Sequence, residues 1–307
     1  MKFGVALPLG RVDPRGEFQS SQAVREIALA VERAGVTGAC VSEHPAPDAD
    51  WLHNDPAAHD ALEPLTALAF VAAATQRLIV FTNVLVLPYR NPFLTAKTAA
   101  TLQVLSDYRL ILGVGVGYQR AEFEALGAAF NQRGALTDEA LETIELAWKG
   151  GRVVKQGRGF NAVGNEPRPV PSPPPPIWIG GASDKAVERA ARWGNGWVPH
   201  FGVPTNDAVV MQSSMVSMDH FTAKLDRLRE AREKLGRSGP FDVAVGAPVR
   251  PKTITPSDAE GFIEKARELQ ARGANWVWTT LPAPSRAGFL ESVAWFSSEV
   301  IARYESA

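Results

Sequence analysis

Polar side chains suited to acid–base chemistry stand directly after several short apolar runs. Glu43 and His44 follow the run GACVS, and His200 follows GWVP. A carboxylate or an imidazole at such a position can exchange a proton with a ligand or hydrogen-bond its carbonyl group. Glu43, His44 and His200 are therefore the candidate catalytic residues.

Two glycine-rich turns offer backbone groups rather than side chains. The first, GVGVGY, contains Gly115, Gly117 and Tyr118; the second, IGGAS, contains Gly180, Gly181, Ala182 and Ser183. A strand, two glycines and a helix start make an anion-binding turn, because the first amides of a helix lack partners. The alternative is a tight turn in which Ser183 only caps the helix. Neither turn is a Walker A loop or a complete G-x-G-x-x-G motif.

The remaining reactive residue types indicate no second kind of chemistry. The sequence has no H-x-H pair on a strand, no H-E-x-x-H helix and no G-x-S-x-G turn, so no metal site or serine nucleophile is expected. His53 and His59 lie in a polar loop, where solvent exposure or an oligomer contact is expected. The single cysteine, Cys40, is expected to be a small core residue.

The elements that must position these residues alternate between short apolar and longer amphipathic runs. This rhythm predicts eight strand–helix units and hence a (β/α)8 TIM barrel, whose active site lies at the carboxyl ends of the strands. The expected strands are Phe3 to Leu7, Gly38 to Ser42, Leu78 to Leu85, Leu110 to Val114, Ile177 to Ile179, Gly196 to Pro199, Val243 to Ala247 and Trp276 to Thr279.

Helical patterns fill the intervals between these strands. They cover Ala23 to Ala34, Pro64 to Ala74, Pro92 to Leu105, Glu122 to Leu126 with Leu136 to Lys149, Asp184 to Trp193, Asp207 to Leu235, Ala259 to Arg272 and Arg286 to Tyr304. Only residues 151–176 break the rhythm, with a short strand pair followed by EPRPVPSPPPP. We interpret this stretch as a hairpin and proline-rich strap inserted before strand 5 of one barrel domain spanning 1–307; a linker between two domains is the alternative.

Composition excludes several classes of protein. With 45% apolar residues in 307, the chain is globular, and a net charge of −1 provides no overall attraction to nucleic acid or anionic membranes. No apolar run approaches the roughly 20 residues of a membrane helix, and MKFGVALPLG is followed by charges too early for a signal peptide. A cytoplasmic protein acting on a small molecule, with no nucleic-acid or membrane partner, is expected.

Four segments are distinctive in combination. They are EHPAP, LVLPYRNPFLTAKTAATLQVLSDYRLILGVGVGYQRAEFEALG, RGALTDEALETIELAW and PPPPIWIGGASDKAVERAARWGNGWVP. Together they resemble one known family, the luciferase-like monooxygenase superfamily, and within it the branch of oxidoreductases that depend on coenzyme F420. The resemblance covers most of residues 1–305 and implies a barrel that binds a flavin or deazaflavin at its mouth. A homodimer is also expected.

The resemblance also implies roles for individual residues. His44 would face the cofactor ring, and Asn83-Val84 would match a bulge in strand 3 that often holds a non-prolyl cis peptide. Gly115 to Tyr118 would flank the cofactor tail, and Gly180 to Ser183 would donate amides to its phosphate. The chain departs from the family pattern at Tyr118, where Trp is typical, and at Asn83, where Gly is common.

The expected activity is therefore hydride transfer between F420 and a small organic substrate, with His44 or Glu43 as the proton donor and His200 as a second candidate. The alternatives are an FMN-dependent monooxygenase and a non-catalytic flavin-binding barrel. The negatively charged tail of F420 would be met by cations around the insertion. The candidates are Arg152, Lys155, Arg158, Arg168 and Lys185.

Overall fold

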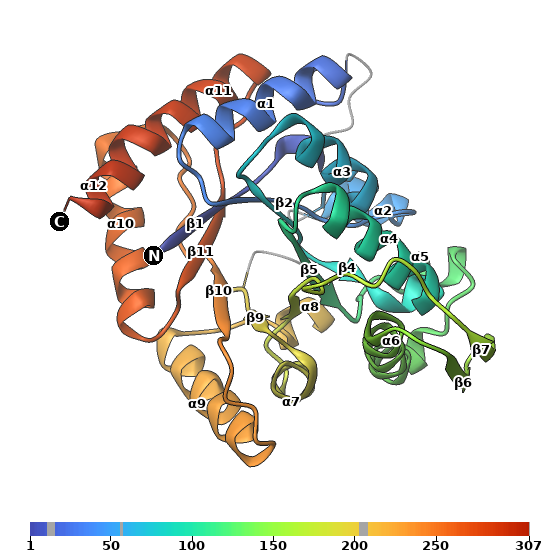
Figure 1. Cartoon of the computed structure of the whole chain (residues 1–307). Helices are drawn as coiled ribbons and strands as arrows, with labels where there is room; N and C mark the ends of the chain where they lie inside the picture. Colours follow the sequence, from blue (N-terminus) through green and yellow to red (C-terminus); the bar gives the residue numbers. More distant parts are fainter. Residues whose placement is uncertain (11–15, 56–57, 203–207, 307) are drawn as a thin grey trace.

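Eight parallel strands close into a barrel in the computed structural model, which describes residues 1–10, 16–55, 58–202 and 208–306. Their order around the barrel is β3-β2-β1-β11-β10-β9-β8-β5, and β5 also pairs with β3 (Figure 1). The predicted (β/α)8 architecture is confirmed. The strands are β1 (Lys2–Ala6), β2 (Gly38–Val41), β3 (Ile79–Thr82), β5 (Leu110–Gly115), β8 (Ile177–Gly180), β9 (Gly196–Val198), β10 (Asp242–Gly246) and β11 (Trp276–Thr280).

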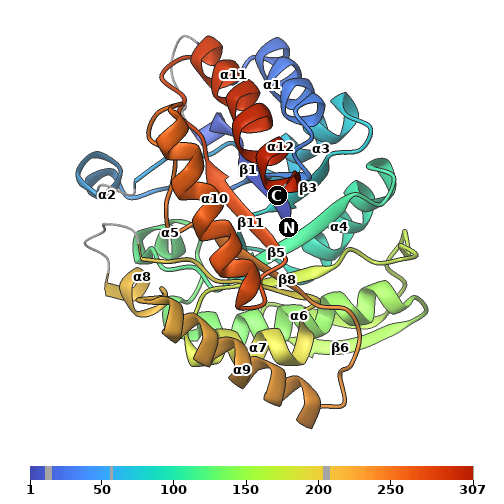
Figure 2. The same ribbon diagram turned by 90° about the vertical axis from the view of Figure 1, so that its left-hand side faces the viewer.

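Helices surround the barrel on the outside (Figures 1 and 2). They are α1 (Ser21–Arg33), α2 (Ala49–Asn54), α3 (Pro64–Ala74), α4 (Pro92–Leu105), α5 (Arg120–Ala125), α6 (Arg133–Lys149), α7 (Asp184–Trp193), α8 (Ala208–Gln212), α9 (Met218–Lys234), α10 (Pro256–Ala271), α11 (Arg286–Trp295) and α12 (Ala302–Glu305). A π-helical turn, Phe296–Ile301, joins the last two. None of these described helices is long and apolar enough to cross a lipid bilayer.

Helix starts follow the local sequence. Pro64 and Pro92 are the first residues of α3 and α4, and the side chains of Glu63 and Asn91 cap them. Proline suits this position because its missing N–H would have no partner there. The buried face of α7 includes Val187 and the neighbouring alanines, as the helical spacing predicts.

One predicted helix is divided. The expected helix Asp207 to Leu235 begins outside the described residues and is interrupted between α8 and α9. Ser214 donates its hydroxyl to the Val210 carbonyl, and the Met215 amide turns away to donate to the His200 carbonyl. Ser217 then caps α9. Serine side chains that compete for backbone groups end the first helix here.

The barrel interior is filled by large side chains at one end. Phe81, Trp178 and Trp276 are fully buried in mutual ring contact, with Trp178 and Trp276 centroids 5.2 Å apart. Cys40 is buried in the same cluster, which confirms its expected place in the core. Burial raises the pKa of its thiol, which also contacts the Asn83 side chain. This packing closes the barrel below the strand ends that carry the candidate site.

Strand 3 of the barrel is not continuous, contrary to the expected run from Leu78 to Leu85. It divides into β3 and β4 (Leu85–Val86), and the peptide bond Asn83–Val84 between them is cis. β4 pairs with β5 through Leu85 and Val86. The bulge that the resemblance implies is therefore present, with its cis peptide, although asparagine stands where glycine is common.

The stretch before β8 forms the expected hairpin and strap. β6 (Val153–Gly157) and β7 (Phe160–Asn165) pair in antiparallel fashion beside α6 (Figure 1). Residues 166–176 contain neither helix nor strand, and the bonds Arg168–Pro169 and Ser172–Pro173 are cis. In Figure 2, β6 lies toward the opposite side of the molecule from α2, α5 and α8.

Candidate functional site

A cavity of about 960 Å³ occupies the end of the barrel where the strands terminate. Almost every residue that the sequence analysis selected as catalytic or cofactor-binding lines it, although these residues come from five different strand ends. They are Glu43, His44, Asn83, Val84, Gly115, Gly117, Tyr118, Gly180, Gly181, Ser183 and His200. Ala182 is the exception, because it is buried outside the lining.

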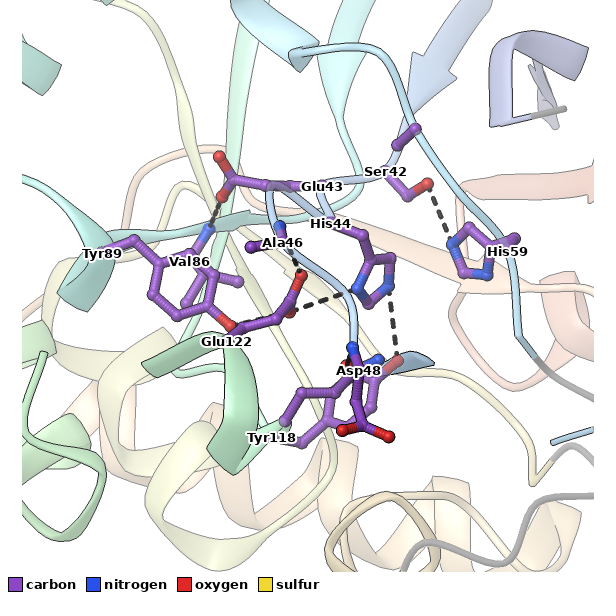
Figure 3. A network of polar contacts seen from close by, with 12 residues as sticks. Ser42, Glu43, His44, Ala46, Asp48, His59, Val86, Tyr89, Tyr118 and Glu122 are labelled. Carbon is purple, nitrogen blue, oxygen red and sulfur yellow. Dashed lines mark hydrogen bonds and ion pairs between the residues drawn. The ribbon is translucent and has the colours of Figure 1, made fainter. Parts of the chain in front are cut away.

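His44, directly after β2, is held in a buried hydrogen-bonded chain (Figure 3). Its Nδ1 lies 3.3 Å from Oε2 of Glu122, and its Nε2 lies 3.4 Å from the hydroxyl of Tyr118. A carboxylate only accepts hydrogen bonds, so Nδ1 carries the proton and donates it to Glu122. In the neutral imidazole, Nε2 is then the basic nitrogen, available to accept a proton.

Glu122, on the first turn of α5, is the centre of this network (Figure 3). It is buried, and besides His44 it accepts hydrogen bonds from the Tyr89 hydroxyl at 3.0 Å and the Ala46 amide at 3.3 Å. Such a carboxylate fixes the orientation and tautomer of the imidazole, as the aspartate does in a hydrolase triad. Burial and the neighbouring Glu122 raise the pKa of the Tyr89 phenol, so Tyr89 remains a hydrogen-bond donor.

Aromatic rings enclose His44 on its other sides. The ring of Trp51, from α2, lies 4.8 Å away at an angle of 36°, and the ring of His59 lies 4.7 Å away, nearly perpendicular. Nε2 of His59 is 3.0 Å from the Ser42 hydroxyl (Figure 3). His59 thus lies half-buried in the cavity wall rather than in solvent as expected, whereas His53 is an exposed residue of α2.

Glu43 lines the cavity but has its carboxylate engaged elsewhere. It accepts hydrogen bonds from the Val86 amide at 2.6 Å and from the Arg90 guanidinium. Burial raises its pKa, and the charge of Arg90 opposes that rise. The structure thus argues against the expected catalytic role of Glu43, because its carboxylate ties β2 to the turn after β4.

The side chain of Val84, which follows the cis bond, explains two of the selected glycines. A Cβ atom on Gly115 would lie 2.6 Å from Val84 Cγ2, and one on Gly180 would lie 2.8 Å from Cγ1. Real Cβ atoms do not approach so closely. These glycines therefore make room for the bulge itself, whether or not a ligand also approaches them.

The contact between Gly115 and Val84 can be tested by substituting both residues. We expect Gly115→Ala to lower the free energy of unfolding by about 1–3 kcal/mol, the usual cost of overpacking a core. The double variant Gly115→Ala with Val84→Ala should regain part of that loss, because the clashing methyl group is gone. Denaturant unfolding of the two single variants and the double variant measures the coupling. Strictly additive losses would contradict the contact.

The turn between β8 and α7 needs a correction to its expected donors. The Gly181 amide donates to the Val198 carbonyl at 3.1 Å, and the Ala182 amide donates to the Ser213 carbonyl at 2.8 Å. Gly181 has φ +96°, a backbone conformation that favours glycine whether or not a ligand binds at the turn. The donors left to an anion are the first amides of α7, which starts at Asp184, but not that of Ala186, which donates to the Ser183 hydroxyl.

Charged groups near this turn are arranged around α7. Asp184, which would repel a phosphate, is ion-paired with Lys224 and Arg227, and these contacts hold its pKa below the usual range. Arg133 and Arg189 line the cavity, and Nε of Arg189 is 2.6 Å from Asp138. Arg133 therefore brings a cation to this part of the wall, whereas the charge of Arg189 is met by Asp138.

The cations expected around the insertion do not reach the site. None of Arg152, Lys155, Arg158, Arg168 and Lys185 lines the cavity, and all except Arg152 have carboxylate partners in the described structure. Arg152 lies against Gly164 within the hairpin. The described structure therefore argues against the prediction that they meet a cofactor tail. The four residues of the hairpin and strap precede β8, away from the carboxyl ends of the strands, and Lys185 at the start of α7 is paired with Glu188.

His200, after β9, stands across the barrel mouth from His44, since four strand positions separate β9 from β2 on either side. Ser214 donates its hydroxyl to Val210 and therefore accepts from Nε2 of His200, 3.0 Å away. Burial, with the charge of Arg250, lowers the pKa of His200 to about 4. His200 is thus neutral near pH 7, with its proton committed to Ser214, which argues against its expected role as a proton donor.

The neutral His200 gives a pH-dependent stability with a definite sign. Its pKa falls from 6.5 when unfolded to about 4 when folded, so between these values the unfolded chain binds more protons and acid favours unfolding. Between pH 7 and pH 5 we expect the free energy of unfolding of the natural chain to fall by about 2 kcal/mol more than that of His200→Asn. Denaturant unfolding at both pH values measures this difference. Equal losses in the two proteins would contradict the assignment.

With the geometry defined, comparison with known proteins identifies the family. The family model described as luciferase-like monooxygenase matches residues 1–260. The chain belongs to this family. The luciferase-like assignment also places the protein among the oxidoreductases.

Individual relatives are more distant. An uncharacterised protein of Mycobacterium tuberculosis is 33% identical over 184 residues, which are 60% of this chain and 59% of that protein. An F420-dependent glucose-6-phosphate dehydrogenase of the same species is 29% identical over 75% of this chain and 67% of its own length. The chain thus spans about three fifths of the first of these relatives.

A solved structure shares the whole luciferase-like barrel. The monooxygenase RslO1 from Streptomyces bottropensis superposes with a TM-score of 0.77 at 18% identity, covering 99% of this chain and all of that one. At this identity the likeness concerns the fold, and it supports the closed barrel described above.

Two residues of the candidate site in this luciferase-like chain escaped the sequence analysis. Glu122 reads as an ordinary acidic residue in a helix start, and the only signal for it is its spacing of four residues from Tyr118, one helical turn. His59 lies 15 residues beyond His44 in a loop without a periodic pattern. In the described part of the chain, no group of three or more His, Cys, Asp or Glu side chains could hold a metal ion.

Proposed function

We propose that this protein transfers a hydride between coenzyme F420 and a small organic substrate. The observation that carries the proposal is the His44 network, in which a buried imidazole with a basic Nε2 lines the same cavity as the Asn83–Val84 bulge. The F420-dependent relative supports the choice of cofactor.

The residues present suit a cofactor of this kind. A cavity of about 960 Å³ lies at the upper end of the usual range for ligand sites. Asn83 and Val84 would lie against the ring, while Ser183, the first-turn amides of α7 and Arg189 would hold the phosphate. When bound, the deazaflavin supplies the hydride chemistry, and the protein supplies placement and proton transfer.

His44 is the proposed catalytic acid or base. In the oxidation of an alcohol, Nε2 accepts the hydroxyl proton, and Glu122 stabilises the resulting imidazolium through Nδ1–H. In the reverse direction the same imidazolium protonates the substrate oxygen. Tyr118 donates to Nε2 in the resting site, so we propose that it also orients the substrate at this nitrogen. Trp51 and His59 restrict the access of water to His44.

The second candidate is an FMN-dependent monooxygenase, which the name of the family favours. A barrel that binds a flavin without turnover is a further alternative. Fluorescence titration of the purified protein with F420 and with FMN separates the cofactors. We expect tighter binding of F420, and an affinity for FMN tenfold higher than for F420 would reverse the assignment.

The oligomeric state, the location and the partners of the protein are also matters of proposal. We propose a homodimer that acts in the cytoplasm on a small molecule, with no nucleic-acid or membrane partner. Light scattering coupled to size-exclusion chromatography measures the mass in solution directly.

A further inference from the structure

The wall of the cavity away from the His44 network carries a second positive charge. Arg250 follows β10 by four residues and lines the cavity together with His200, which follows β9. Arg250 is exposed at the rim, yet enough protein surrounds its guanidinium that burial lowers its pKa. Among the described residues, no carboxylate forms an ion pair with it. The two described carboxylates of the cavity wall, Glu43 and Glu122, are both engaged elsewhere.

The position of Arg250 separates it from the proposed phosphate site of the cofactor. That site lies at β8 and α7, with Arg133 and Arg189, whereas β9 intervenes between β8 and β10. One phosphate at α7 is already served by two arginines and by helix amides. Arg250 is therefore a separate cation on a different part of the rim.

Between Arg250 and His44 the wall is largely apolar. In the barrel order, β11 and β1 stand between β10 and β2, and both contribute lining residues at their carboxyl ends. From β1 come Ala6, Leu7 and Pro8; from β11 and the residues after it come Trp278, Thr280, Leu281, Pro282 and Ala283. A ligand that spans this wall would meet a cation at one end, hydrocarbon in the middle and the basic nitrogen of His44 at the other end.

We infer that Arg250 is an anion subsite for the substrate, and that the substrate is a small organic molecule with a carboxylate or phosphate group remote from its reacting carbon. The inference rests on the proposed function for the identity of the reacting end. The planar guanidinium suits either anion, because its paired N–H groups match two oxygens at once. The neutral His200 leaves the charge of Arg250 as the dominant one on this side.

Binding of anionic probes tests the subsite independently of turnover. The protein, with and without saturating F420, is titrated by calorimetry with inorganic phosphate, with butyrate and with neutral butanamide. We expect one or both anions to bind more tightly than butanamide, and Arg250→Gln to weaken that binding at least tenfold. Arg250→Lys keeps the charge but loses the paired N–H groups of the guanidinium, so its anion affinity should lie between those of the natural protein and Arg250→Gln. Arg303→Gln, on the remote helix α12, is the matched control and should bind like the natural protein.

The outcomes separate the possible origins of the anion. Tighter binding of butyrate assigns a carboxylate substrate, and tighter binding of phosphate assigns a phosphate ester. Unchanged anion affinity in Arg250→Gln would overturn the subsite. An equal loss of F420 affinity in that variant would also overturn it, by assigning Arg250 to the cofactor. If F420 fails to bind while anion binding still depends on Arg250, the proposed function is wrong and the subsite stands.

Discussion

Replacing His44 with alanine is expected to lower the rate of hydride transfer by about 10²-fold or more, the usual contribution of a positioned general acid or base. The physical reason is that Nε2 of His44 is the basic nitrogen of the network, fixed by the hydrogen bond from Nδ1 to Glu122. Cofactor affinity should change much less, because the bulge, the α7 turn and the nearby arginines are untouched. Stopped-flow measurement of a single turnover gives the rate without contributions from product release.

His53→Ala is the matched control for this experiment. His53 lies on α2 and is exposed, and its Nδ1 hydrogen-bonds the Ala49 carbonyl of the same helix at 2.6 Å. It should keep the natural single-turnover rate. A His44→Ala variant that turns over as fast as the control would reduce His44 to a packing residue and remove the proposed proton transfer.

The second large effect is expected at Glu122, which acts through His44 rather than on the substrate. Glu122→Gln keeps the size of the side chain but removes the charge that stabilises the imidazolium, and its amide can present an N–H to Nδ1, which favours the wrong tautomer. We expect single-turnover rates about 10- to 10²-fold lower. Tyr89→Phe, which removes one of the other hydrogen bonds to Glu122, should have a much smaller effect.

Non-additivity distinguishes this positioning role from a general structural one. In the double variant His44→Ala with Glu122→Gln, the second substitution should cost almost nothing further, because residues that act as one unit lose their effect together. A merely structural Glu122 would add its full loss to that of His44→Ala. A double variant whose rate loss equals the product of the two single losses would therefore contradict the positioning role of Glu122.

Much of the fold follows from the sequence because the barrel repeats one local pattern. Each strand is a short apolar run and each helix an amphipathic one, so their order identifies the architecture, and the barrel geometry then places the residues after each strand at one end. This reasoning brings His44, Tyr118 and His200 into one cavity from distant positions.

What escaped prediction depends on side-chain partners that no local pattern encodes. Whether a carboxylate is catalytic depends on its neighbours: Glu43 is tied to Val86 and Arg90, whereas Glu122 holds His44. The Ala182 amide was expected to be free, but its acceptor is Ser213, whose position depends on the break between α8 and α9. The cations of the hairpin and strap were assigned from their proximity in sequence to β8, although residues that precede a strand lie at its amino end, away from the site.

The most direct test of the proposed function is an anaerobic single turnover with bound F420 and a panel of small secondary alcohols, including anionic and neutral pairs. We expect the deazaflavin absorbance to disappear at a rate that His44→Ala lowers about 10²-fold or more, with no requirement for oxygen. If only FMN supports turnover, and only when oxygen is present, the protein is a monooxygenase and the proposed hydride transfer is wrong.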